Sequence, residues 1–279
     1  MKWAVVIISP HGYIHSSCFR EIADTIVAGF HNLGIDCDLS IGTCVPGRQN
    51  LILGTNLIPF HSIDIPNDSI LYNLEQVQNN TNWLSESMIN ILKRYRIWDY
   101  SKSNEVELNR LGIKVERILP IGYSKVLEKM NHNTIKDIDA IFVGSMNERR
   151  RIALERIQAK GLKVVHLFGI YGQQRDDMLV RAKILLNLHF YEAKVLEVAR
   201  ISYYLANRCA VLSEHSANKD DDIIFYGGVE FSNYDELPDR AEMLCNDIAK
   251  QRFLSSEGYR IMSKLRIEDF LEPILNSYL

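Results

Sequence analysis

Short apolar runs alternate with amphipathic segments along the sequence, and the first pair sets the pattern. Residues 3–8 are continuously apolar, which predicts a strand buried on both faces of a sheet. After a turn, apolar side chains recur at helical spacing over residues 19–33, with Ser16 or Ser17 as the expected N-terminal cap and Gly34 as the expected end. This alternation predicts an α/β protein whose parallel strands are joined by right-handed crossovers.

The same alternation continues to about residue 124 and then restarts. Further strands are expected at residues 36–41, 51–53, 70–74, 96–99 and 115–119, with helices at residues 81–95 and 103–111. After a polar stretch at residues 128–137, strands are expected at residues 140–143, 163–168, 184–188 and 210–213, with helices at residues 148–160, 175–182 and 194–206. We therefore expect two Rossmann-like parallel-sheet domains, 1–124 and 125–279, that face an interdomain cleft. Whether the C-terminal helix returns to the first domain stays open.

The composition excludes several classes of protein. The 279 residues carry 32 Lys and Arg against 35 Asp and Glu, a net charge of −3, so no global field attracts nucleic acid or anionic lipid. Five cysteines without CxxC spacing argue against a disulfide framework and a cysteine-rich zinc site, and favour a reducing cytoplasm. No stretch approaches the ~18 apolar residues of a membrane span, and the first apolar run is too short for a signal peptide. The composition leaves the oligomeric state open.

A glycine turn followed by three arginines is the first candidate site. In the run Gly144-Ser145-Met146-Asn147-Glu148-Arg149-Arg150-Arg151, an apolar strand passes through a turn into a helix. Backbone N–H groups and the positive end of the helix dipole attract a phosphate there, whereas three arginines repel that dipole unless an anion is present. The sequence therefore predicts an anion site. The alternative is a solvated basic run in which Arg151 pairs with Glu155.

The second candidate site is the segment 187–197, which also follows an apolar strand and enters a helix. Glu192 and Glu197 lie five residues apart, so they do not share a helical face. A carboxylate here can accept hydrogen bonds from sugar hydroxyls, and Lys194 can neutralise a phosphate. The alternative is that Glu197 only complements the helix dipole.

In the first domain, polar residues follow two of the apolar strands. His11 comes after the first strand, and Asn73, Glu75 and Gln76 lie at the end of the strand at residues 70–74. Because the carboxyl ends of parallel strands meet at one edge of a sheet, we expect these side chains to face the cleft. Glu75 is the candidate general acid or base and His11 is the alternative, with a structural role open for each.

Several well-known motifs are absent. The sequence contains neither the GxGxxG pattern of dinucleotide oxidoreductases nor the GxxxxGK[ST] pattern of P-loop proteins. It also lacks the HExxH zinc motif and the GxSxG nucleophile elbow. The acidic residues at 137–139 precede a predicted strand, and those at 220–222 lie in a predicted polar loop. Both positions favour turn and solubility roles over metal binding. We therefore expect no metal site.

The order of these segments resembles the donor-binding domain of GT-B fold glycosyltransferases, close to the family 1, family 4 and CgeB-like groups. The resemblance rests on residues 118–123 (Ile-Leu-Pro-Ile-Gly-Tyr), 141–144 (Ile-Phe-Val-Gly), 168–172 (Phe-Gly-Ile-Tyr-Gly), 182–199 and 210–213. It covers residues 118–215, and in the first domain it extends only to the strand–loop–helix opening.

The resemblance implies an enzyme of glycan biosynthesis that moves a sugar from a nucleotide-diphosphate sugar to a hydroxyl acceptor without a metal or cofactor. It implies a base-binding loop at Phe168, Gly169 and Tyr171, a diphosphate site at Gly144, Ser145, Arg149, Arg150, Arg151 and Lys194, and ribose or sugar contacts at Glu197, Glu192 and His189. The first domain would hold an acceptor of unknown identity, and its near-neutral charge argues against nucleic acid. Two alternatives stay open: a GT-B-like transferase or epimerase that uses another activated donor, and a non-catalytic nucleotide-sugar-binding protein.

Overall fold

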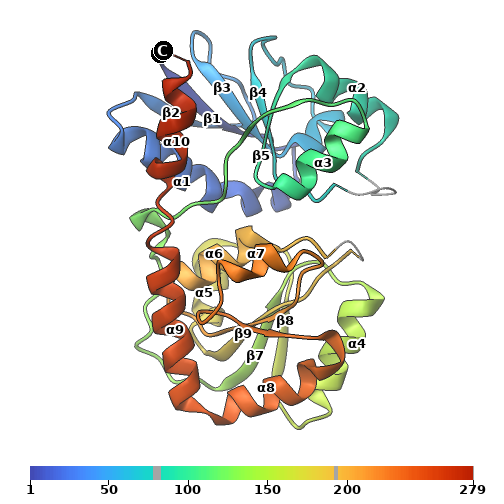
Figure 1. The fold of residues 1–279 in the computed structure, drawn as a ribbon, viewed down its shortest axis with the longest axis vertical. Coiled ribbons are helices and arrows are strands. Elements are labelled where there is room, and N and C mark those ends of the chain that lie inside the picture. Colours follow the sequence, from blue (N-terminus) through green and yellow to red (C-terminus); the bar gives the residue numbers. More distant parts are fainter. Residues whose placement is uncertain (78–82, 192–193, 279) are drawn as a thin grey trace. The chain divides into compact units, whose positions relative to one another are not determined.

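The computed structural model describes residues 1–77, 83–191 and 194–278, which form two compact units (Figure 1). Unit 1 comprises residues 1–126 and the segment that starts at Arg266, and unit 2 comprises Leu127–Leu265. The first boundary between the units follows residue 126, two residues after the predicted end of the first domain at residue 124. The last helix of the chain belongs to unit 1. Each unit has its own parallel sheet flanked by helices. The predicted α/β class with two parallel sheets is confirmed.

Unit 1 contains a six-stranded sheet with the strand order β2-β1-β3-β4-β5-β6. Its strands are β1 (Trp3–Ile7), β2 (Cys37–Ile41), β3 (Gln49–Leu53), β4 (Ile70–Asn73), β5 (Arg96–Asp99) and β6 (Val115–Ile118). Its α-helices are α1 (Arg20–Asn32), α2 (Glu86–Arg94), α3 (Lys102–Arg110) and α10 (Ile267–Asn276). The 3-10 helices η1 (Ile14–Phe19) and η2 (Thr55–Phe60) follow β1 and β3, and η3 (Lys125–Leu127) leads out of the unit. Every residue of β1 and β3 is buried, as the apolar runs at residues 3–8 and 51–53 predict, and the burial of β3 includes the polar Gln49 and Asn50 at its start.

Unit 2 contains a five-stranded parallel sheet with the order β11-β10-β9-β7-β8. Its strands are β7 (Ile138–Val143), β8 (Val164–Leu167), β9 (Ala182–Asn187), β10 (Val211–Glu214) and β11 (Glu230–Ser232). Its helices are α4 (Glu148–Gln158), α5 (Gly172–Leu179), α6 (Val198–Ala206), α7 (Lys219–Ile223), η4 (Tyr234–Glu236), α8 (Leu237–Asn246) and α9 (Ile248–Met262). Helices α4 and α8 pack over one apolar core that includes Phe142, Leu186 and Leu212.

Four helix starts differ from the sequence-based expectation. Helix α5 begins at Gly172, three residues before the predicted position 175, and the other three are those of α1, α2 and α6. Neither Ser16 nor Ser17 caps α1, because η1 runs directly into that helix and the N-cap residue Phe19 makes no side-chain capping bond. Helix α2 begins at Glu86 with Ser85 as its cap, later than expected, and the predicted residues 81 and 82 lie outside the described chain. Helix α6 begins at Val198 rather than at Lys194, whose φ of +48° is incompatible with a right-handed helix.

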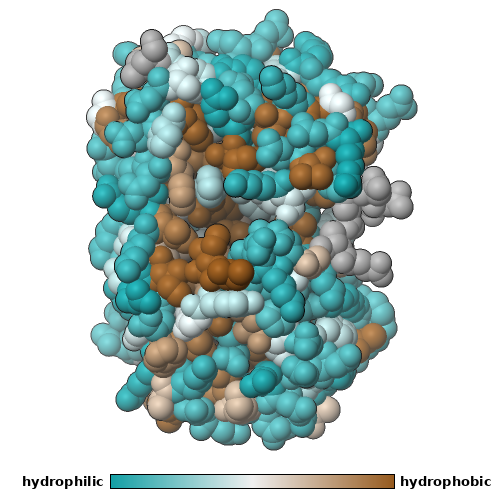
Figure 2. Space-filling view, viewed as in Figure 1, coloured by the Kyte–Doolittle hydropathy of each residue, from teal (hydrophilic) through white to brown (hydrophobic). Residues whose placement is uncertain are grey.

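On the face of the protein shown in Figure 2, hydrophilic side chains cover most of the surface and apolar side chains gather in small groups. Among the described helices, none has the length and apolar character that crossing a bilayer requires.

Helix α9 packs so closely on its neighbours in unit 2 that position 258 has no room for a side chain. A Cβ atom on Gly258 would lie 2.6 Å from Leu205 Cδ2 and 2.9 Å from the carbonyl oxygen of Gly228. Helix propensity alone predicts that Gly258→Ala raises stability by about 0.8–1 kcal/mol. We expect the opposite, a loss of about 1–3 kcal/mol in the free energy of unfolding, because overpacking dominates. Urea denaturation measures the change, and the exposed α9 position Ser256→Ala serves as the control. A more stable Gly258→Ala protein would contradict the close packing.

Candidate functional site

The sheet of unit 2 has a topological switch point between β7 and β9. These two strands are neighbours, but the chain continues from β7 to β8 on one side and from β9 to β10 on the other. The turn at residues 144–147 and the loop at residues 188–197 therefore leave the sheet side by side at its carboxyl edge. Open parallel sheets bind ligands at such a point. Both sequence-predicted segments of the second domain lie here.

Gly144, at the end of β7, faces two guanidinium groups. Its φ is +147°, and a Cβ atom on it would lie 3.0 Å from Arg200 Nη2 and 3.6 Å from Arg150 Nη1. Both guanidinium groups lie over the Phe142 ring, at 5.3 Å for Arg200 and 4.9 Å for Arg150. The Gly144 N–H donates to the carbonyl of Leu167 and is not free for an anion. The cationic character of this turn therefore comes from side chains, one of which the sequence analysis did not single out.

The N-terminal end of α4 is capped by its own sequence. Asn147 Oδ1 accepts a hydrogen bond of 2.9 Å from the backbone N–H of Arg150. Its Nδ2 atom donates to the carbonyl of Phe190 at 2.8 Å, which connects the 144–147 turn to the 188–197 loop. The cap thus occupies part of the expected helix-terminal anion site and holds the two loops in register.

Arg150 is buried, and its guanidinium binds main-chain carbonyls of both loops. Its guanidinium donates to the Leu188 carbonyl through Nε at 3.0 Å and Nη2 at 2.6 Å, and to the Ser145 carbonyl through Nη1 at 2.9 Å. Nη2 also lies 3.3 Å from Glu197 Oε1. Burial, followed by the nearby charge of Arg200, lowers the pKa of the Arg150 guanidinium to about 9. Arg150 therefore remains a cation at neutral pH and fixes both loops.

Glu197 is the carboxylate at the centre of the switch point. It occupies the N-cap position of α6 without making a capping bond. Its Oε2 atom lies 2.9 Å from His189 Nδ1 and 3.3 Å from Asn187 Nδ2, and Asn187 Oδ1 accepts from Arg200 Nη1 at 2.6 Å. Burial alone raises the pKa of Glu197. The contacts with His189, Arg200 and Arg150 together lower it by more than burial raises it, so the net shift of the pKa is downward. Glu197 is therefore an anion that nitrogen donors of His189, Asn187 and Arg150 contact.

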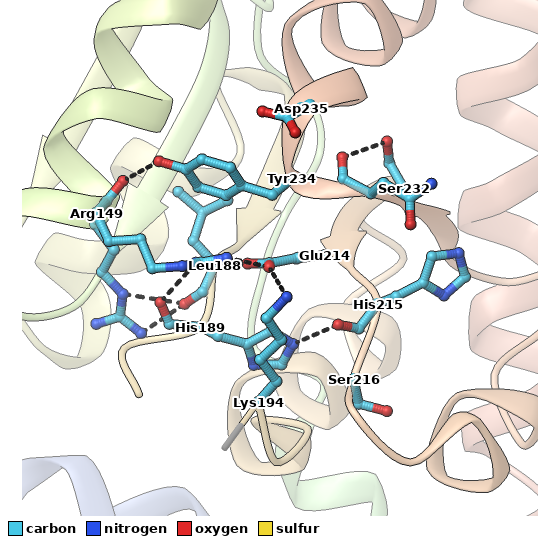
Figure 3. A network of polar contacts seen from close by, with 12 residues as sticks. Arg149, Leu188, His189, Lys194, Glu214, His215, Ser216, Ser232, Tyr234 and Asp235 are labelled. Carbon is cyan, nitrogen blue, oxygen red and sulfur yellow. Dashed lines mark hydrogen bonds and ion pairs between the residues drawn. The ribbon is translucent and has the colours of Figure 1, made fainter. Parts of the chain in front are cut away.

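Arg149, the residue before Arg150 in α4, meets a second buried carboxylate, Glu214 (Figure 3). Arg149 Nη1 donates to Glu214 Oε2 at 2.7 Å and Nη2 donates to Oε1, which also lies 3.3 Å from Lys194 Nζ. The Arg149 guanidinium stacks 4.2 Å from the Tyr234 ring, and the hydroxyl of that tyrosine donates to the Arg149 carbonyl. Glu214 is the second residue of the site that the sequence analysis missed.

Arg151 and the base-loop residues lie elsewhere. Arg151 pairs with Glu148 and Glu155 on the exposed face of α4, which is the arrangement given above as the alternative for this residue. Phe168, Gly169 and Tyr171 lie between β8 and α5, at the carboxyl end of the strand next to β7, and the Phe168 side chain is exposed. The predicted contact Glu192 lies outside the described residues.

The candidate acid–base groups of unit 1 follow two different strands. His11 lies in the exposed turn after β1 and Glu75 follows β4, and β3 separates these strands in the sheet. The Glu75 carbonyl accepts hydrogen bonds of 2.9 Å from the buried amides of Asn73 and Asn104. Those amides also donate to the buried Asp99, whose pKa burial raises to about 7. Burial also raises the pKa of Glu75.

The described side chains at the switch point carry a net positive charge. Four cations, Arg149, Arg150, Arg200 and Lys194, surround two carboxylates, Glu197 and Glu214, which leaves +2 with His189 counted as neutral. Over residues 1–77, 83–191 and 194–278, no three His, Cys, Asp or Glu side chains group as metal ligands would. The site thus matches a doubly charged anion.

Solved glycosyltransferases of the GT-B fold share this architecture. HepE from Anabaena, solved in complex with UDP and glucose, superimposes with a TM-score of 0.63 at 9% identity, over 99% of this chain and 100% of that one. AviGT4, a glycosyltransferase of avilamycin A biosynthesis, gives a TM-score of 0.61 at 14% identity over 100% and 97% of the chains. The chain therefore has the GT-B fold.

Sequence relatives come from a giant virus. Two uncharacterized proteins of Acanthamoeba polyphaga mimivirus are 37% identical over 126 residues and 31% identical over 157 residues. These matches cover 43% and 54% of this chain, but only 14% and 51% of the viral proteins. The chain thus spans about half or less of the length of these relatives. No protein-family model matches the chain.

Proposed function

We propose that the chain is a metal-independent glycosyltransferase that moves a sugar from a nucleotide-diphosphate sugar to a hydroxyl acceptor. The observation that carries this proposal is the +2 cluster at the β7–β9 switch point of a GT-B fold, because the diphosphate of such a donor carries two negative charges. UDP in the solved structure of HepE and UDP-glucose in that of T4 phage BGT, which has a similar fold, support the choice of ligand class.

In the proposed reaction, Arg200, Arg149 and Lys194 bind the diphosphate beside Gly144, and the buried Arg150 holds the two loops in place. The bond from the anomeric carbon to the phosphate oxygen breaks, a new bond to the acceptor oxygen forms, and the acceptor proton leaves to a base. The cations stabilise the negative charge that grows on the departing diphosphate, so the proposal requires no metal ion. Glu197 and His189 contact the ribose or the sugar, and the loop at residues 168–171 contacts the nucleobase.

In this proposal, unit 1 holds the acceptor. Glu75 is the proposed base, because burial raises its pKa toward the range in which a carboxylate accepts a proton efficiently. The Asn73 and Asn104 amides hold the main chain of this residue in one position. His11, exposed after β1, is the alternative base.

Titration calorimetry with UDP, GDP, ADP and dTDP tests the donor site, and release of free nucleotide from the corresponding sugar nucleotides tests catalysis. Binding of one diphosphate together with turnover supports the transferase. Binding without turnover favours the non-catalytic nucleotide-sugar-binding alternative. Absence of binding to every nucleotide would overturn the proposed function.

The ribose contact leads to a prediction for Glu197→Gln. We expect this variant to weaken UDP binding by about tenfold, the cost of a hydrogen bond to a charged group. The loss should be small for 2′-deoxyuridine diphosphate, which lacks one hydroxyl, so the preference for UDP should disappear in the variant. Calorimetry with both ligands measures this ratio. A lower melting temperature with an unchanged ratio would show that Glu197 only holds Arg150 and His189 in place.

A further inference from the structure

We propose that Glu214 is a positioning residue that orients Arg149 and Lys194 toward the diphosphate, an inference that rests on the proposed function. Glu214 ends β10 and is 1% exposed, whereas the side chains of Arg149 and Lys194 are 22% and 38% exposed. A carboxylate at this depth is out of reach of a bound ligand, but the two cations that it holds are not. Glu214 therefore acts through its partners.

The contacts of Glu214 join three separate segments of unit 2. Arg149 comes from the first turn of α4, Lys194 from the loop after β9, and Glu214 from the end of β10. Oε1 faces both cations and Oε2 accepts from Arg149, so both carboxylate oxygens are engaged (Figure 3). A bidentate arginine–carboxylate pair fixes direction as well as distance. One carboxylate thus sets the relative position of two charges that the sequence places 45 residues apart.

Lys194 has further features that point to a fixed position. Its φ of +48° lies in the left-handed region, which is strained for a residue with a Cβ atom. Its carbonyl accepts from the N–H of Ala217, in the segment that follows β10. Backbone and side chain are therefore both tied to the region of Glu214. Strain of this kind persists only where the surroundings determine the conformation.

Arg149 is held on three further sides. Its Nη1 atom donates to the His189 carbonyl at 3.2 Å, and its guanidinium stacks on the Tyr234 ring. The Tyr234 hydroxyl donates to the main-chain carbonyl of Arg149. A phosphate can use the remaining N–H directions without displacing Glu214. The opposite role, in which Glu214 competes with the phosphate for these cations, would require a buried carboxylate to give up its partners with no access to water.

The two roles predict opposite effects for Glu214→Gln. The substitution removes one negative charge, so Coulomb attraction alone predicts tighter binding of a diphosphate. Loss of orientation predicts weaker binding, because an amide has one acceptor oxygen instead of two and turns its own N–H groups toward one of the cations. We expect the dissociation constants of UDP and of inorganic pyrophosphate to rise by about tenfold or more.

Calorimetry with UDP and pyrophosphate at several salt concentrations tests the inference on the full chain, with each variant held below its melting temperature. Glu148→Gln removes an exposed partner of Arg151 and is the control, with an expected change below about twofold. Lys194→Ala should weaken binding in the wild-type background and have a much smaller effect in the Glu214→Gln background. A shallower salt dependence in Glu214→Gln should accompany this coupling. Neither readout follows from a loss of stability alone.

A second variant keeps the test decisive if Glu214→Gln does not fold. Arg149→Lys keeps the positive charge but loses the bidentate pair, and we expect it to weaken pyrophosphate binding to a similar extent. Unchanged or tighter binding in Glu214→Gln, or unchanged binding in Arg149→Lys, would overturn the positioning role while wild-type binding upholds the proposed function. If the wild-type protein binds no diphosphate, both proposals fail.

Discussion

Arg200→Ala is expected to raise the dissociation constant of UDP by about 10- to 100-fold, the equivalent of one or two charge-assisted hydrogen bonds. Arg200 Nη2 lies beside Gly144 at the switch point, and Nη1 is anchored on Asn187. In the proposed complex this residue therefore provides an oriented cation beside the diphosphate. Calorimetry at fixed ionic strength measures the loss.

Arg151→Ala is the matched control for this prediction. Both substitutions remove one guanidinium from a helix of unit 2, so they change the net charge equally. Arg151 is paired with Glu148 and Glu155 on the exposed face of α4, and we expect its removal to change UDP affinity by less than about twofold. Equal effects of the two variants would mean that UDP responds only to total charge, which would contradict a site at Gly144.

The strand positions could be predicted from the sequence because short apolar runs alternate with amphipathic segments, the pattern of parallel strands that helices cover on both faces. Residues 3–8 and 51–53 fall within or next to β1 and β3, which are buried along their whole length. The helix starts were harder to predict, because they depend on contacts outside the helix. Lys194 shows the reason: lysine has no preference for a left-handed backbone, and only the surrounding loop imposes one.

The candidate site was predicted as two segments but not as a set of contacts. Three consecutive arginines were equivalent in the sequence, whereas successive helical positions point about 100° apart and so meet different surroundings. Arg150 is consequently buried, Arg149 binds Glu214, and Arg151 faces solvent. The difference arises from the tertiary fold, which a local pattern does not contain.

The two missed residues differ in how far the sequence pointed to them. Arg200 lies three positions after Glu197, so helical spacing places both near the start of α6. Glu214 follows three residues of a buried strand, and a carboxylate that continues such a run is itself unusual because burying an unpaired charge is costly. A search for charged residues at strand ends would have found Glu214, but not its partners.

Gly144→Ala is expected to weaken UDP binding by about 100-fold or more, the largest effect of a single substitution in the site. The new Cβ atom would lie 3.0 Å from Arg200 Nη2 and 3.3 Å from Phe142 Cζ, and the φ of +147° is strained for any side chain. The methyl group would occupy the space beside the guanidinium groups and move Arg200 from its place. Calorimetry with UDP and pyrophosphate should show the same loss, because the change concerns the diphosphate and not the nucleoside.

Gly161→Ala separates this effect from backbone strain. Gly161 follows α4 with a φ of +81°, and a Cβ atom there meets no heavy atom within 4 Å. We expect this variant to lose about 1 kcal/mol of stability through its left-handed backbone and to bind UDP like the wild type. Thermal denaturation of both variants beside the calorimetry completes the comparison. If Gly144→Ala loses stability but keeps its UDP affinity, the diphosphate does not bind at the turn after β7, and the cationic cluster there has a structural role.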